Sequence, residues 1–126
     1  MARQNEFVDF VIEQLAPIGE VRARAMFGGY GIYQGDTMFA IIDADQLYFK
    51  ADDITRREFT ERGLNPFTYA SRGKTITMQY YEAPPEVFEE LEAMQNWAQQ
   101  AIQAALRKKR DRKSSSPALR RTRGKS

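Results

Sequence analysis

The chain has 126 residues, enough for one domain with a modest core and a terminal tail. It contains no cysteine and no histidine, which excludes disulfides, cysteine-based zinc sites, thiolate nucleophiles and a Ser-His-Asp triad. The N-terminal residues lack the apolar segment of a signal peptide, and no apolar run is long enough to span a membrane. We therefore expect a soluble, cytoplasmic protein without metal or cofactor.

The net charge of +2 conceals a strong asymmetry along the chain. Residues 107–126 carry ten lysines and arginines against one aspartate, whereas residues 1–106 carry nine basic and sixteen acidic residues. This division predicts an acidic domain over residues 1–106 and a basic tail over residues 107–126 that is mostly disordered. Densely spaced cations bind polyanions by counterion release, without base specificity. The candidate polyanion-binding residues are Arg107, Lys108, Lys109, Arg110, Arg112, Lys113, Arg120, Arg121, Arg123 and Lys125.

The first half of the chain predicts a helix followed by consecutive strands. Apolar residues recur at helical spacing between Asn5, a candidate N-cap, and the break at Pro17 and Gly19. From Val21 the apolar spacing changes to two, which is the period of a strand. Turn residues at 34–37 and 43–46 divide the stretch that ends at Lys50 into short antiparallel strands.

The second half predicts a short helix, two more strands and a long helix. Asp52 and Asp53 open the short helix, with Ile54 and Phe59 as its apolar contacts and Gly63 just after its end. Residues 71–74 form a hairpin turn between the last two strands. The long helix is predicted to start at residues 84–85, a Pro-Pro pair, and to run to about residue 107, with a turn or two beyond.

This order of elements predicts an α+β fold. We expect an antiparallel meander sheet of about five to six strands, with the N-terminal helix and the long C-terminal helix packed against it and the short helix between strands. Apolar residues from Val87 to Ala105 follow a 3.5-residue period, which suits either docking on the sheet or a dimer contact. Docking is the favoured interpretation, and the oligomeric state is open between monomer and homodimer.

The stretch Arg24–Tyr33 resembles the signature of the TfoX N-terminal domain family, named for the TfoX/Sxy regulators of natural competence. Further stretches resemble the family in the expected order: Leu47–Lys50, Gly63–Tyr69, Met78–Pro84 and Trp97–Ala101. The resemblance covers roughly residues 5–106. The signature residues are Met26, Phe27, Gly28, Gly29, Tyr30 and Gly31.

The resemblance implies an antiparallel sheet flanked by helices, in agreement with the pattern of apolar residues. It also implies a link to transcriptional activation of competence genes, alongside a DNA-binding activator. The full-length regulators of this family carry a second, helical C-terminal domain, whereas a basic tail occupies that place here.

The signature stretch contains two candidate sites. The cluster of Gly28, Gly29 and Gly31 can form a phosphate cradle, but it matches neither a dinucleotide-binding nor a P-loop pattern, and a bent or bulged strand is favoured. Arg22 and Arg24 share one face of a strand and, with Lys50, form a candidate anion-binding site. The competing interpretation is a solvated sheet face whose cations pair with carboxylates.

We interpret the remaining aromatic and acidic side chains as structural rather than as binding or catalytic groups. Aromatic residues of the predicted strands suit base stacking, but the acidic body disfavours the approach of phosphates, so we interpret them as core and edge residues. The carboxylates do not identify an acid/base pair, and we expect no catalytic residues and no enzyme.

The function predicted from these features is a non-enzymatic TfoX-like accessory protein. Its α+β body would engage a protein partner, with the transcription machinery as the candidate, while the tail binds nucleic acid without sequence preference. The alternative is a domain that binds or senses a small anionic ligand through Arg22, Arg24 and Lys50.

Overall fold

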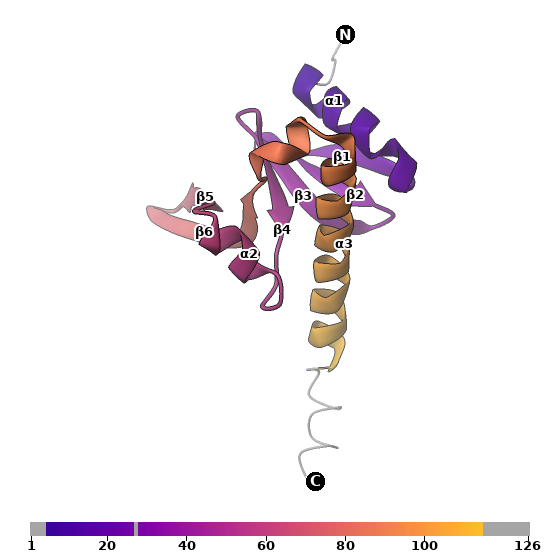
Figure 1. Ribbon diagram of the computed structural model, residues 1–126. Coiled ribbons are helices and arrows are strands. Elements are labelled where there is room, and N and C mark those ends of the chain that lie inside the picture. The colour runs from indigo at the N-terminus through magenta and orange to yellow at the C-terminus, as the bar shows by residue number, and fades with distance from the viewer. Residues whose placement is uncertain (1–4, 27, 115–126) are drawn as a thin grey trace.

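A computed structural model describes residues 5–26 and 28–114 of the chain, with side chains to Arg110 (Figure 1). Helices, 3-10 turns (η) and strands alternate along the chain with short connections. In chain order they are α1 (Glu6–Leu15), η1 (Ala16–Ile18), β1 (Val21–Met26), β2 (Gly29–Gln34), β3 (Thr37–Asp43), β4 (Gln46–Lys50), α2 (Arg56–Glu61), β5 (Pro66–Ser71), β6 (Lys74–Glu82), η2 (Pro85–Phe88) and α3 (Leu91–Ser114).

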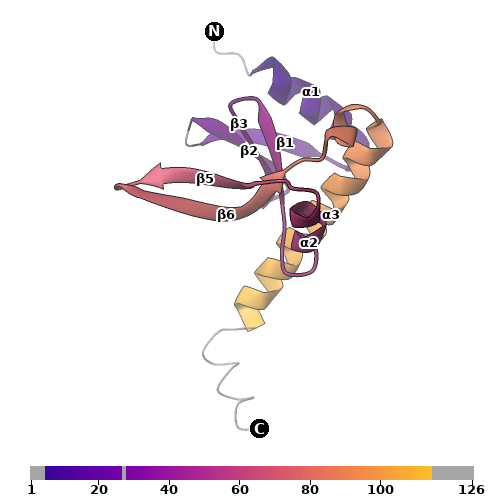
Figure 2. The same ribbon diagram turned by 60° about the vertical axis from the view of Figure 1, so that its left-hand side comes forward.

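The six strands form one antiparallel sheet in the order β1-β2-β3-β4-β6-β5, which confirms the predicted α+β class. Only β1 to β4 make a continuous meander. The β5–β6 hairpin then joins through β6, where Phe49 of β4 lies opposite Tyr81. As a result β5 becomes an edge strand, and the hairpin extends away from α3 (Figure 2).

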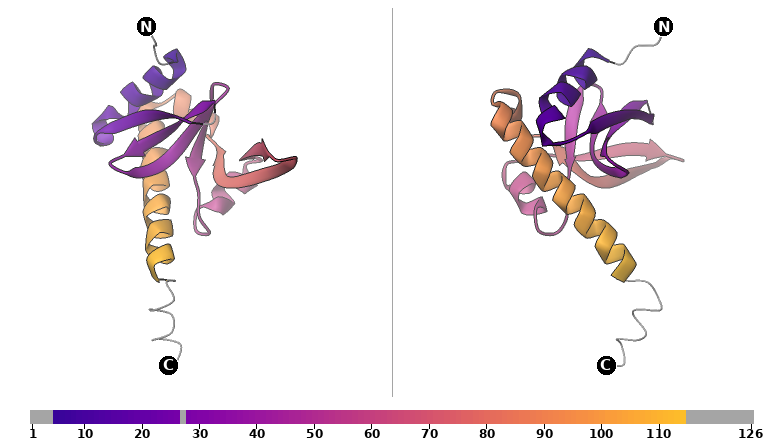
Figure 3. Two further views of the ribbon diagram at one scale, coloured as in Figure 1. Left: turned by 180° about the vertical axis from the view of Figure 1, so that it is seen from behind. Right: turned by 90° about the vertical axis from the view of Figure 1, so that its right-hand side faces the viewer.

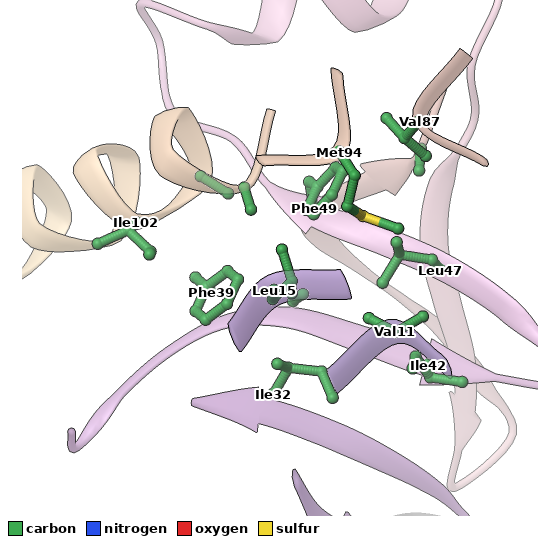
Figure 4. Close-up of a cluster of buried hydrophobic side chains, with 14 of the residues drawn as sticks. Val11, Leu15, Ile32, Phe39, Ile42, Leu47, Phe49, Val87, Met94 and Ile102 are labelled. Carbon is green, nitrogen blue, oxygen red and sulfur yellow. The ribbon is translucent and has the colours of Figure 1, made fainter. Parts of the chain in front are cut away.

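Both long helices cover the same face of the sheet, and the main core lies between them and the strands (Figures 3 and 4). Helix α1 contributes Val11 and Leu15, and α3 contributes Met94 and Ile102. These side chains meet the inward-facing residues of the strands, among them Ile32, Phe39, Ile42, Leu47 and Phe49. The apolar residues of α3 therefore dock on the sheet, as the favoured interpretation predicted.

Local turn chemistry appears where the sequence predicts it. The Asn5 side chain accepts a 2.6 Å hydrogen bond from the Phe7 N–H and so caps α1. Both hairpin turns at Ala44–Asp45 and at Arg72–Gly73 use two residues with positive φ, which matches the twist of the flanking strands. These turns set the register of β3 with β4 and of β5 with β6.

Three predicted helix features are wrong. Helix α2 begins at Arg56, because Asp52 caps the turn before it by accepting hydrogen bonds from the Ile54 and Thr55 N–H groups. Ile54 is 70% exposed and contributes nothing to the core. The pair Pro84 and Pro85 starts a 3-10 turn, and α3 begins only at Leu91.

Helix α3 continues without a break across the predicted domain boundary at residue 106 and ends at Ser114. Arg107, the first residue of the predicted tail, forms a two-point ion pair with Asp52: its Nε lies 2.6 Å and its Nη2 3.2 Å from the two carboxylate oxygens. The Asp52 side chain is only 12% exposed. The pair therefore holds α3 against the segment that leaves β4.

No helix within the described residues is long and apolar enough to cross a membrane.

Replacing Asp52 with asparagine should lower the free energy of unfolding at neutral pH by about 2 kcal/mol, the range for hydrogen bonds to charged groups. Burial acts to raise the pKa of Asp52, but hydrogen bonds from Arg107 and Thr55 outweigh it and hold the pKa below its ordinary 3.8. A carboxylate with a lowered pKa stabilises the fold above its unfolded-state pKa, and this contribution is lost as the pH falls through the folded-state pKa. Urea unfolding between pH 7 and pH 2 measures both effects.

The control for this experiment is Asp53→Asn, because the Asp53 side chain is 89% exposed and its ion pair with Arg56, one turn away, is a surface pair. It should leave the stability and its acid dependence almost unchanged. Equal losses in the two variants would show that the Arg107–Asp52 pair does not anchor α3.

Candidate functional site

The face of the sheet opposite α1 and α3 carries a second apolar cluster, which we call the open face. No residue of a described helix belongs to it. Its buried centre is Ile41, Phe67 and Tyr80. Partly buried side chains surround this centre: Met26, Met38, Tyr48, Tyr69 and Met78. The open face thus presents thioethers and aromatic rings rather than a layer of ions.

The glycines of the signature stretch adapt the backbone to this face. Gly28, with φ of +81°, lies in the tight turn between β1 and β2. A Cβ built at Gly29 would lie 2.3 Å from the Ile42 carbonyl oxygen, and one at Gly31 would lie 2.6 Å from the Met38 sulfur. The cluster is therefore a hairpin turn followed by a closely packed strand. The bulge that we predicted within it lies one residue further on, between Ile32 and Tyr33.

Of the six signature residues, Phe27 lies outside the described part of the chain. Met26 reaches the open face, where its sulfur would lie 3.0 Å from a Cβ at Gly31. Tyr30 packs against the main core instead.

Arg22 and Arg24 both project from β1 towards the ring of Tyr33. Their guanidinium carbons lie 5.3 Å and 5.6 Å from the ring centroid, within the range of cation–π attraction. Arg22 also donates a 2.8 Å hydrogen bond to the Gly35 carbonyl. Within the described residues neither arginine pairs with a carboxylate, so the predicted salt-bridged face does not form here.

Lys50 lies elsewhere, at the end of β4, with its Nζ 4.9 Å above the ring of Tyr80. It lines a cavity of about 220 Å³ between the β2–β3 turn, the end of β4, β6 and residues 105–109 of α3. Arg22 and Arg24 do not line this cavity. Tyr33 connects the two groups, because its ring faces both arginines and also lines the cavity.

We call this the lysine cavity, and α3 supplies part of its wall. Its lining consists of Tyr33, Asp36, Thr37, Met38, Lys50, Tyr80, Ala105, Lys108 and Lys109. Lys109 donates hydrogen bonds to the Asp36 carboxylate at 3.3 Å and to the Thr37 hydroxyl at 3.1 Å. Sequence reasoning assigned Lys108 and Lys109 to the tail and missed their contact with the sheet. The only sequence signal for this placement is the presence of possible acidic partners in the body: Asp36, which pairs with Lys109, and Asp52, which pairs with the neighbouring Arg107.

Tyr80 forms the inner wall of the lysine cavity. Burial raises the pKa of its hydroxyl well above the ordinary value, with a smaller contribution from Tyr33, so the phenol stays neutral. The hydroxyl donates a 3.3 Å hydrogen bond to the Met38 carbonyl. Tyr80 therefore acts here as a fixed, neutral wall.

The other predicted polyanion-binding residues divide into two groups. Arg110 is exposed near the end of α3, and the helix backbone continues through Arg112 and Lys113. The side chains of these two residues, and the whole of residues 115–126 with Arg120, Arg121, Arg123 and Lys125, lie outside what the structure describes.

A second cavity, of about 610 Å³, has an uncharged lining. It lies between η1, β2 and α3 and carries five carboxamide side chains and two isoleucines: Gln34, Asn96, Gln99, Gln100, Gln103, Ile18 and Ile102. Within the described residues, no group of three acidic side chains is placed to hold a metal ion.

A family model described as the TfoX N-terminal domain matches residues 13–105. The chain is 26% identical over 100 residues to protein Sxy of Escherichia coli K12, covering 79% of this chain and 48% of that protein. It is 28% identical over 86 residues to DNA transformation protein TfoX1 of Aliivibrio fischeri, covering 68% and 39%. It is 31% identical over 84 residues to DNA transformation protein TfoX of Haemophilus influenzae, covering 64% and 38%. The chain spans less than half the length of these curated relatives.

Substituting alanine at Gly29 should destabilise the fold more than the same substitution at Gly31. The added Cβ at Gly29 meets a carbonyl of the neighbouring strand, which cannot move without disturbing the sheet, and should cost about 1–3 kcal/mol. At Gly31 the nearest atoms are the sulfurs of two flexible methionines, so the cost should be smaller. Chemical denaturation of the two variants tests this order, and the reverse order would contradict the packing described here.

Proposed function

The chain belongs to the TfoX N-terminal domain family, and from this premise we propose that it is a competence-related regulatory protein. It acts by binding nucleic acid and a protein partner rather than by catalysis. Two of the relatives are named DNA transformation proteins, and it is their regulatory association with DNA uptake that we extend to this chain.

The observation that carries the nucleic-acid part of the proposal is the basic end of α3. Arg107 and Lys109 hold this part of the helix to Asp52, Asp36 and Thr37 of the body. Beyond them the helix continues to Ser114, past the end of the sheet (Figure 1). Arg110, Arg112 and Lys113 thus belong to a tethered helix rather than to a free tail.

A basic helix end of this kind provides affinity for nucleic acid without preference for a base sequence. Lysine and arginine neutralise phosphates and release counterions, and this gain does not depend on the bases. A helix that is already ordered loses less conformational entropy on binding than a flexible segment does. Sequence preference would then come from the DNA-binding activator that the family resemblance implies.

The opposite end of the molecule has the features of a protein contact. The segment from η2 to the first turn of α3 carries four exposed or half-exposed glutamates, Glu86, Glu89, Glu90 and Glu92, of which Glu86 pairs with Arg62. Next to them Phe88 is 39% exposed and its ring lies tilted against that of Phe7 of α1, with the centroids 5.8 Å apart, while Leu91 is 50% exposed. Acidic residues around exposed apolar side chains suit a partner with a basic rim, and they repel nucleic acid. The transcription machinery is our candidate source of that partner.

The DNA-binding proposal predicts a loss of salt-dependent affinity when the free end of α3 is neutralised. We expect the full chain with Arg110, Arg112 and Lys113 replaced by glutamine to bind duplex DNA more weakly in fluorescence anisotropy. The slope of log K against log salt should become shallower by about two to three, since each lost phosphate contact removes about 0.9.

The matched control replaces Arg56, Arg57 and Lys74 with glutamine. It removes the same charge from residues on α2 and at the start of β6. Its affinity and salt slope should stay close to those of the unaltered chain. An equal loss of affinity in both triple variants would show that DNA binding depends on net charge alone and would overturn the proposed role of α3.

A further inference from the structure

The lysine cavity joins cations from segments far apart in the sequence. Lys50 comes from the end of β4, and Lys108 and Lys109 come from α3. Asp36 is the one carboxylate among the lining residues; it pairs with Lys109, and its side chain is 94% exposed. The lining therefore holds three lysines and one carboxylate. Arg22 and Arg24, behind the Tyr33 ring, add to the positive potential from the other side.

We propose that the lysine cavity binds a phosphate group. A tetrahedral phosphate anion needs donors that converge from several directions, and lysine ammonium groups from two elements, β4 and α3, supply them as compact point charges. The arginines that would grip a planar carboxylate with two parallel hydrogen bonds lie outside the lining.

The uncharged lining residues fit the same ligand. Thr37 is 7% exposed and accepts a hydrogen bond from Lys109, which leaves its hydroxyl proton to donate to a phosphate oxygen. Tyr80 is a rigid wall, because its ring is buried and its hydroxyl is bonded to the Met38 carbonyl. Tyr33 is only half-buried and offers an aromatic face to whatever the phosphate carries.

The size of the cavity limits what enters it. About 220 Å³ is less than the 300–1,000 Å³ of pockets that enclose a whole drug-sized ligand. The cavity therefore takes the phosphate group, and the rest of the ligand lies outside, near Tyr33. The phosphate comes either from a free phosphorylated metabolite or from a nucleic-acid backbone that α3 holds nearby; the second source rests on the proposed function.

The test titrates the isotope-labelled full chain with inorganic phosphate, adenosine monophosphate and a short DNA duplex, each followed by amide NMR shifts and calorimetry. We expect shifts centred on Thr37, Lys50 and Lys108. Replacing Lys50 or Lys108 by glutamine should weaken binding of the small phosphates about tenfold. Lys108 is exposed on a helix surface, so Lys108→Gln keeps the test valid if Lys50→Gln disturbs the fold.

The matched control is Lys74→Gln, an exposed lysine at the start of β6 outside the lining. It should leave binding unchanged. Shifts spread over all surface lysines, or an equal loss in Lys74→Gln, would overturn the proposal. So would the absence of any effect of Lys50→Gln and Lys108→Gln on all three probes, even where the duplex still binds through α3.

The two candidate sources give different results. If small phosphates bind and the duplex does not, the cavity serves a free metabolite, and the nucleic-acid part of the proposed function fails while the cavity assignment stands. If the duplex binds and Lys50→Gln weakens it, the cavity holds a backbone phosphate. The triple variant of Arg110, Arg112 and Lys113 should keep its affinity for inorganic phosphate in either case.

Discussion

The packing of α3 across β3 and β4 is the constraint on which the rest of the molecule depends. Ala98 and Ala101 are almost fully buried on the inner side of the helix, and their small side chains let its backbone lie close to the sheet. Phe39 of β3 and Phe49 of β4 fill the space between the helix and the sheet. Because α1 packs on the same face, the methionines and aromatic residues of the opposite face are left without a helical cover.

The same packing aligns the charges of the molecule with the helix axis. Glutamates gather at the N-terminal end of α3, and lysines and arginines occupy its last turns. Each sign lies near the helix end whose partial charge it complements, which stabilises the helix. The separation of charge that we connect with two kinds of partner is thus also favourable for folding.

The features that were predictable from sequence are those that local chemistry determines. Asn5 caps α1 because its side chain reaches an N–H two residues away. Ala44 and Asp45 form a hairpin turn because the short loop between two strands requires positive φ. The error at Pro84 and Pro85 has a local cause as well, since proline suits the first turn of a 3-10 helix as well as that of an α-helix.

The features that were not predictable depend on contacts between distant segments. Alternation placed Arg22 and Arg24 on one face, but the register of β1 with β2 decides that their neighbour is Tyr33. Likewise, only the path of α3 brings Lys108 to the same cavity as Lys50. Composition alone made residues 107–110 part of a tail, because the carboxylates that bind Arg107 and Lys109 lie more than fifty residues away.

The anchoring of α3 by Arg107 and Lys109 also has a mechanical consequence. Five residues follow Lys109 within the helix, and at 1.5 Å per residue they form an arm of about 7.5 Å beyond the last tether. A force applied to this arm is transmitted to two points, the β2–β3 turn through Asp36 and the segment after β4 through Asp52. Anything that binds the arm is therefore held in a fixed orientation to the sheet, and its pull acts on these two ion pairs as well as on the core packing of α3.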